Sequence, residues 1–292
     1  IVPKIFVRTD LFGRLELNNS LNLKKNNLVS IEWEREELYS YFFKLILAKS
    51  KEQLFKILQD STNFDESIKL EIIKSSQIYN QIPLKRHLLE PLVTLTFGKE
   101  VIKTNTWAAS KNYKGNNQQR ETNLGNSYEY FFFNFKNAND TISIRPFINF
   151  MSYVSTDSLS KQNLDLYKNT LPLISSSIYL KNEFRDLAVE EHFSDLTNEG
   201  NLELKYIVQY LRENTQYKFQ YLTSIELQEF LNGVIENYKS ELNGKSREEL
   251  QELLEANGII AEQIKPDGRI YFFAMLFKFW LGLKSRKYQY GK

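Results

Sequence analysis

Apolar residues recur along this chain at two spacings, one typical of helices and one typical of strands. In the segment 34–48 they lie three and four positions apart, which predicts an amphipathic helix. Its apolar positions are Leu38, Tyr41, Phe42, Leu45 and Ile46. Further helices are predicted over 51–58, 66–79 and 180–192. Short apolar or alternating runs predict strands over 5–7, 28–33 and 92–97.

The middle of the chain alternates between polar and aromatic stretches. Two prolines, Pro83 and Pro91, predict a short connector before the strand at 92–97. Residues 103–127 are rich in Asn, Gln, Ser and Gly, which predicts a polar loop or insertion. The run YEYFFFNF at 128–135 predicts a strand or a helix packed against a core.

A proline marks the start of the next predicted helix. Pro146 directly follows Arg145, and proline is favoured at the first position of a helix because its missing N–H would have no partner there. The apolar face of this helix consists of Phe147, Phe150, Met151 and Val154.

The segment 202–292 has the clearest pattern. Apolar spacing predicts a first helix at Leu204–Leu211, and two capping boxes, Thr223–Glu226 and Ser246–Glu249, open a second and a third. A Pro-Asp-Gly turn at 266–268 then joins two strands of a hairpin. The order helix, helix, helix, hairpin is that of a winged helix.

Composition narrows the classes of function. The chain has 292 residues, 42% of them hydrophobic and 14% aromatic, which excludes global disorder. It contains no cysteine, so disulfides, thiolate catalysis and cysteine-bound zinc are excluded, and a cytoplasmic location is expected. Its two histidines, His87 and His192, are far apart, and we predict no metal site. The longest apolar run, 270–283, contains Lys278 and predicts no membrane span.

The charge is unevenly distributed, although the net charge is only +2. Residues 269–292 include basic side chains and no acidic ones. Those predicted to contact nucleic acid are Arg269, Lys284, Arg286 and Lys287. A solubilising tail is an equally good interpretation. The third predicted helix of the winged helix carries four glutamates, which disfavours entry into the major groove and favours docking to a protein.

Two arginines are candidates for binding a phosphate. Arg8 ends a predicted strand, where ligands bind in open α/β sheets, and Arg145 lies at a predicted helix start. Taken singly, each is also compatible with a structural role. The Gly-Lys-Ser at 244–246 is not a phosphate loop, because Lys239 stands where that loop needs glycine and a helix precedes it.

These motifs occur in a recognisable order: a strand ending in Arg8-Thr9-Asp10, then Trp-Glu-Arg-Glu-Glu-Leu at 33–38, the helix start at Arg145 and the winged helix. The chain resembles the C-terminal part of a bacterial P-loop ATPase of the AAA/STAND-like superfamily. It is similar in particular to large prokaryotic ATPases, many of them linked to antiviral defence. The resemblance implies that Arg8 is a first sensor and Arg145 a second, that Thr9 and Asp10 lie near the nucleotide, and that ATP and Mg²⁺ are the cofactors.

The sequence departs from this family in two ways. The phosphate loop and the acidic metal-binding strand are absent, so we expect them from a missing N-terminal segment or another chain. Position 34 is Glu, where Ser or Thr is the commoner cap.

We therefore predict an α+β, mainly α chain with four parts. They are the end of a nucleotide-binding core (1–33), a helical lid-like region (34–160), a connector (161–201) and a winged helix (202–292). The predicted function is a nucleotide-driven molecular switch or assembly ATPase, inactive without its phosphate loop, forming a homo-oligomer and docking a protein partner. The alternatives are a non-enzymatic winged-helix regulator that binds DNA or protein, and a scaffold that has lost nucleotide binding.

Overall fold

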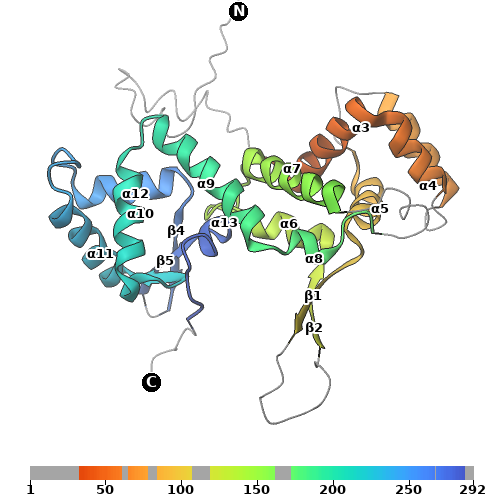
Figure 1. Ribbon diagram of the computed structural model, residues 1–292. Coiled ribbons are helices and arrows are strands. Elements are labelled where there is room, and N and C mark those ends of the chain that lie inside the picture. Colours follow the sequence, from red (N-terminus) through yellow and green to blue (C-terminus); the bar gives the residue numbers. More distant parts are fainter. Residues whose placement is uncertain are drawn as a thin grey trace, which may run out of the picture. The chain divides into compact units, whose positions relative to one another are not determined.

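The computed structural model describes residues 33–60, 65–77, 84–106, 119–161, 172–266 and 268–286. The strand predicted over 5–7 lies outside these residues, as does the strand predicted over 28–33 except for residue 33, which is not in a strand. The described residues are mainly helical and hold two small antiparallel sheets (Figure 1), which confirms the α+β, mainly α class. No helix in the described part of the chain is both long and apolar enough to cross a membrane.

The chain forms two compact units. The first consists of 33–135 and 143–188. We call it the lid unit only because it overlaps the region predicted from the sequence to be lid-like. Its elements are α3 (Arg35–Asp60), α4 (Glu66–Gln77), α5 (Arg86–Phe97), β1 (Glu100–Thr106), β2 (Gln119–Asn126), α6 (Ser127–Asn134), α7 (Ile144–Lys161), α8 (Ser176–Tyr179) and the start of α9 (Asn182–Asn198).

Aromatic rings form the core of the lid unit. Phe97 of α5 and Phe131 of α6 lie with their ring centroids 4.6 Å apart, and Phe147 of α7 meets Tyr39 of α3 edge to face at 5.9 Å. All four side chains are almost completely buried. Edge-to-face and tilted pairs add about 0.5–1.5 kcal/mol each to the burial of the rings.

The helix predicted over 34–48 is present, but its buried face differs in part. Leu38 and Phe42 are buried as predicted, whereas Tyr41 is 41% exposed and contacts Trp33. Tyr39 and Phe43 are buried instead. The helix also continues to Asp60 and includes the segment predicted as a separate helix.

The predicted strand at 92–97 is wrong, because these residues end helix α5. Pro91 lies inside this helix, where it removes one backbone hydrogen bond. The residues that α5 buries follow helical spacing: Leu88, Leu89, Leu92, Val93, Leu95, Thr96 and Phe97. The packing of this face outweighs the local effect of the proline.

Residues 103–127 were predicted as a polar loop or insertion, and the loop is wrong for the described residues 103–106 and 119–126, which lie in strands. Strands β1 and β2 pair antiparallel, with Ile102 opposite Asn123 and Thr104 opposite Glu121. In Figure 1 this hairpin extends beyond the helices of its unit. Most of its described side chains are exposed, so neither strand shows the alternation of apolar and polar residues by which strands are predicted. The aromatic run that follows is helix α6, one of the two predicted possibilities.

The second unit, called here the C-terminal unit, contains 136–142 and 189–286 among the described residues. Its elements are the end of α9, α10 (Glu203–Glu213), the 3₁₀ turn η2 (Thr215–Tyr217), β3 (Tyr221–Thr223), α11 (Ser224–Asn237), α12 (Arg247–Ala256), β4 (Ile260–Lys265), β5 (Gly268–Phe273) and α13 (Met275–Lys278).

The three predicted helices and the hairpin of this unit are confirmed. Both capping boxes form: the Thr223 hydroxyl accepts from Glu226 N–H, and the Ser246 hydroxyl accepts from Glu249 N–H. Strand β5 pairs antiparallel with β4 on one side and with β3, which was not predicted, on the other. Gly258 follows α12 with φ of 64°, as expected of a helix-ending glycine.

Helices α10 and α11 approach closely at Gly233. A Cβ added there would lie 2.1 Å from the Tyr210 hydroxyl oxygen and 2.6 Å from its Cζ. Tyr210 itself packs near Phe230, with ring centroids 5.8 Å apart. Glycine at position 233 therefore permits this helix contact.

We predict that Gly233→Ala destabilises the protein. In a helix interior this change alone would stabilise by about 0.5–1 kcal/mol, but the collision with Tyr210 reverses the sign and costs about 1–3 kcal/mol. The measurement is the urea midpoint of unfolding, with Tyr210→Leu as the matched second change. Tyr210→Leu should lower stability less in the Gly233→Ala variant than in the wild-type protein, because it removes the collision. If the stability losses of the two changes simply add, the account is contradicted.

Candidate functional site

Four of the residues predicted to bind ligands lie outside the described residues. They are Arg8, Thr9, Asp10 and Lys287. Their roles stay predictions.

Arg145 lies in the first turn of α7 and is exposed. The predicted apolar face of this helix is confirmed, since Phe147, Phe150, Met151 and Val154 are all buried. The predicted start was wrong by two residues, because α7 begins at Ile144 and Pro146 is its third residue. A proline there still costs no hydrogen bond, since the first four N–H groups of a helix have no partner within it. Arg145 is therefore helical and not extended.

Most of the residues predicted to contact nucleic acid interact with other residues of the C-terminal unit. Arg269 Nε lies 3.3 Å from a carboxylate oxygen of Glu262. Arg286 Nη1 lies 2.8 and 3.0 Å from the two carboxylate oxygens of Glu226, and its guanidinium lies over the Phe219 ring. Lys284 is exposed, and its backbone carbonyl accepts from Gln220 N–H.

Glu226 thus both completes the capping box of α11 and forms an ion pair with Arg286. Burial alone would raise the pKa of Glu226, but the hydrogen bonds from Thr223 and Arg286 together hold it below its ordinary value. The carboxylate is therefore charged at neutral pH and fastens Arg286 to the start of α11.

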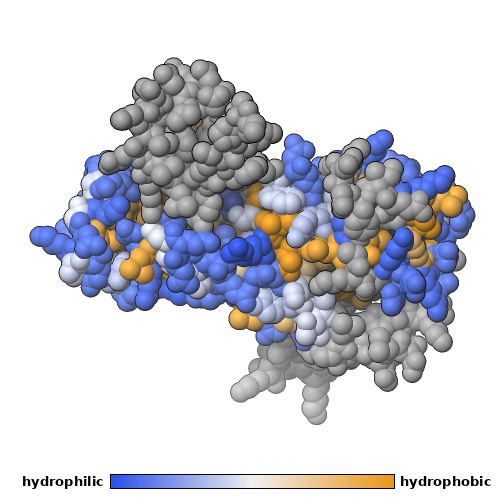
Figure 2. Space-filling model, turned by 90° about the horizontal axis from the view of Figure 1, so that it is seen from above, coloured by the Kyte–Doolittle hydropathy of each residue, from blue (hydrophilic) through white to orange (hydrophobic). Residues whose placement is uncertain are grey.

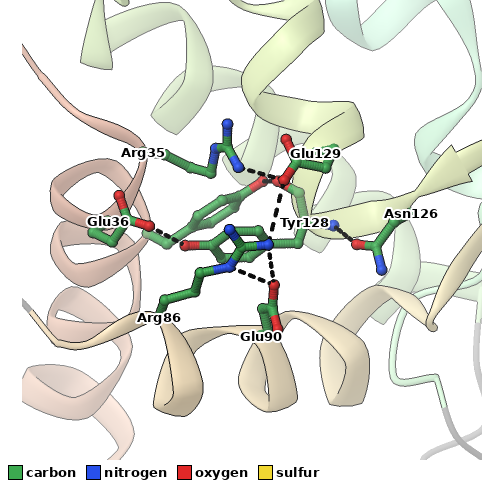
Figure 3. Close-up of polar contacts among 8 residues, drawn as sticks. Arg35, Glu36, Arg86, Glu90, Asn126, Tyr128 and Glu129 are labelled. Atoms are coloured by element: carbon green, nitrogen blue, oxygen red, sulfur yellow. Dashed lines mark hydrogen bonds and ion pairs between the residues drawn. The ribbon is translucent and has the colours of Figure 1, made fainter.

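A different set of polar residues stands out in the lid unit, where three helices begin close together (Figure 3). Arg35 and Arg86 are the first residues of α3 and α5, and Glu129 is in the first turn of α6. Each helix start carries a partial positive charge, so an arginine there is unfavourable unless a negative group offsets it.

Glu129 supplies that negative charge to both arginines. Arg35 Nη1 donates a hydrogen bond to Glu129 Oε1, and Arg86 Nη2 lies 3.6 Å from the same oxygen. Arg86 also bonds to Glu90 at 2.7 Å, and this hydrogen bond raises the pKa of Arg86. The Arg35 side chain is 25% exposed and the Glu129 side chain 49%, so the group is open to solvent on one side.

Tyr128 lies among these charges. The guanidinium carbons of Arg35 and Arg86 lie 5.5 and 5.4 Å from its ring centroid, within the range of cation–π attraction. Its hydroxyl donates to Glu36 at 3.0 Å, and its ring stacks on Tyr39 at 4.9 Å. Asn126 holds the start of α6 by accepting from Tyr128 N–H at 2.8 Å.

Both tyrosines stay neutral at physiological pH. Burial raises the pKa of Tyr128, and the hydrogen bond to Glu36 raises it further. Burial also raises the pKa of Tyr39 well above its ordinary value, and its hydroxyl donates to the Tyr128 carbonyl at 2.8 Å. These phenols therefore act as hydrogen-bond donors and not as bases.

One donor in this cluster is unused. Arg35 Nε is buried and has no hydrogen-bond partner among the described residues. Leaving such a donor unsatisfied costs about 1–3 kcal/mol. Arg35, Arg86, Glu129 and Tyr128 were not predicted as a site, because no motif joins residues so far apart in sequence. The only sequence signal is an arginine at the first position of a helix.

The C-terminal unit contains a comparable arrangement. Glu190 accepts from Trp280 Nε1 at 2.7 Å and lies 3.6 Å from Arg212 Nη2. The Arg212 guanidinium lies over the Trp280 ring at 4.4 Å, and Phe193 lies 4.9 Å from that ring. Residues of α9 and α10 thereby cover the indole that follows α13.

No group of three or more His, Cys, Asp or Glu side chains in the described part of the chain is placed to hold a metal ion. Comparisons with protein-family models, with curated protein sequences and with solved structures find no match.

We predict that Arg35→Ala destabilises the protein more than Arg86→Ala. Arg35 is mostly buried and contacts Glu129 and the rings of Tyr128 and Phe132, so its loss should cost about 1–3 kcal/mol. Arg86 is 57% exposed, so solvent screens its ion pairs and its loss should cost less than the loss of Arg35. The stability of each variant is measured by urea unfolding, monitored by circular dichroism. Equal effects, or a larger effect of Arg86→Ala, would be inconsistent with this ranking.

Proposed function

We propose that this chain is the C-terminal portion of a nucleotide-driven P-loop ATPase that acts as a molecular switch or assembly ATPase. The observation that supports this best is the position of Arg145, exposed in the first turn of α7, where backbone N–H groups also favour an anion. In this proposal Arg145 stabilises charge on the nucleotide phosphates. The phosphate loop and the Mg²⁺ ligands would come from residues outside this chain.

Arg145→Ala is expected to slow ATP hydrolysis by about a hundredfold, because removing one donor that stabilises transition-state charge has an effect of this order. The assay is ATP turnover by the full-length protein. Arg212→Ala, a half-exposed arginine of the C-terminal unit, is the matched control and should leave turnover unchanged. Circular dichroism checks the fold. A folded Arg145→Ala protein with wild-type turnover would eliminate this role for Arg145.

We also propose that 202–292 is a winged helix that docks a protein and not DNA. The element order α10, β3, α11, α12, β4, β5, with β5 between β3 and β4 in the sheet, supports the winged helix. Figure 2 supports a polar interface, since the visible surface of α10 to α12, at the left, is mainly hydrophilic with scattered apolar residues.

The charge of α12 is the observation that favours a protein partner. Its acidic side chains are Glu248, Glu249, Glu252 and Glu255. A hydrogen bond from Arg247 lowers the pKa of Glu248, and one from the Ser246 backbone lowers the pKa of Glu249, so both are ionised at neutral pH. These charges repel DNA phosphates and suit a basic protein surface.

A gel-shift assay with random duplex DNA tests this choice. At physiological salt we expect a dissociation constant no lower than about 10⁻⁶ M, the lower end of the range for non-specific DNA binding. Tight binding that weakens with salt and is lost in an Arg269→Gln, Lys284→Gln double variant would support the DNA alternative instead. Arg286 is left unchanged because its ion pair with Glu226 supports the fold.

A further inference from the structure

The group formed by Arg35, Arg86 and Glu129 has features that an internal ion pair does not require. Two guanidinium groups from the starts of two helices approach one carboxylate, which is itself in the first turn of a third helix, and Arg86 also pairs with Glu90 through Nε and Nη2. All three positions favour a negative charge between them. Figure 3 shows the Glu129 carboxylate between the two arginine side chains.

Glu129 accepts a hydrogen bond from only one of the two arginines. Arg86 Nη2 lies 3.6 Å from Glu129 Oε1, which is too far for a hydrogen bond. Arg35 bonds to Glu129 through Nη1, while its Nε is buried and has no hydrogen-bond partner among the described residues. Arginine can bind an anion through two parallel N–H groups, whereas the hydrogen bond from Arg35 to Glu129 uses Nη1 alone.

The Tyr128 ring keeps both guanidinium groups in place. Each lies about equally far from its centroid, at 5.5 Å for Arg35 and 5.4 Å for Arg86. Tyr128 is itself fixed by its stacking on Tyr39, its hydroxyl bond to Glu36 and the cap at Asn126. The two arginines would therefore keep their positions if Glu129 moved away, and Glu129 is exposed enough to do so.

We propose that Arg35 and Arg86 form a binding site for a phosphate group, which the Glu129 carboxylate occupies until a ligand displaces it. A phosphate dianion carries more charge than a carboxylate and offers more acceptor oxygens in a tetrahedral arrangement, so it can bond to both arginines at once. Glu90 stays bonded to Arg86 and keeps its guanidinium oriented. This site does not include Arg145 and requires no ATP hydrolysis.

Isothermal titration with inorganic pyrophosphate tests the site. Removing the competing charge in Glu129→Gln should tighten pyrophosphate binding at least tenfold over wild type. Adding Arg86→Gln or Arg35→Lys to that variant should reverse the gain. Glu190→Gln is the matched control, because Glu190 also pairs with an arginine beside an aromatic ring, and it should bind as wild type does.

Equal pyrophosphate affinity in wild type and Glu129→Gln would overturn the proposal, as would affinity that does not depend on Arg86. If Glu129→Gln does not fold by circular dichroism, Glu129→Asp takes its place. The shorter side chain withdraws its charge from the arginines, so binding should tighten in the same direction, and unchanged affinity in Glu129→Asp would again overturn the proposal.

Titrations with ATP and with adenosine identify the source of the phosphate. Tighter binding of ATP than of pyrophosphate to Glu129→Gln would show that the site takes the phosphates of a nucleotide, and equal binding would show that it takes free phosphate. Binding of adenosine with the same affinity as ATP would contradict a phosphate site altogether.

Discussion

The ion pair between Arg35 and Glu129 determines how the polar end of the lid unit is built. Helices α3 and α5 both begin with arginine, at the end where the helix dipole is already positive. A nearby carboxylate offsets the cost of such a start, and Glu129 in the first turn of α6 provides one for Arg35. This requirement links the starts of three helices that are far apart in the sequence, and it draws Tyr128 into the same cluster.

The apolar sides of these three helices pack together with α7. Tyr39, Phe97, Phe131 and Phe147 come from four different helices and pack as tilted and edge-to-face rings. Tyr39 belongs to both regions, since its ring meets Phe147 and its hydroxyl bonds to the Tyr128 carbonyl. Aromatic packing therefore orients the side chains that hold the charges, while the charges offset the dipoles of the helices that carry the rings.

Local patterns predicted those elements whose ends and faces are encoded within a few residues. The capping boxes at Thr223 and Ser246 and the apolar face of α7 are of this kind, and all were confirmed. Elements that depend on distant packing were missed. Pro91 suggested a break, yet the buried face of α5 keeps the helix intact, and the polar strands β1 and β2 have no apolar period to reveal them.

The charged cluster was missed for the same physical reason, because its members share no motif and meet only after folding. Trp-Glu-Arg-Glu-Glu-Leu at 33–38 was noted as a motif, but nothing in it indicates that Arg35 faces Glu129. The sequence did indicate an unusual helix cap at Glu34. In the structure the Glu37 carboxylate accepts a hydrogen bond from Glu34 N–H at 2.9 Å, which is one half of a capping box.

The most direct test of this account is a double-mutant cycle between Arg35 and Glu129, measured as the free energy of unfolding in urea. The single variants Arg35→Gln and Glu129→Gln and the double variant give the coupling energy between the two side chains. Because the Arg35 side chain is mostly buried and hydrogen-bonds directly to Glu129, we predict a coupling of about 1–3 kcal/mol, above the usual value for surface pairs. A coupling near zero would mean that Arg35 and Glu129 do not stabilise each other, and would contradict the account.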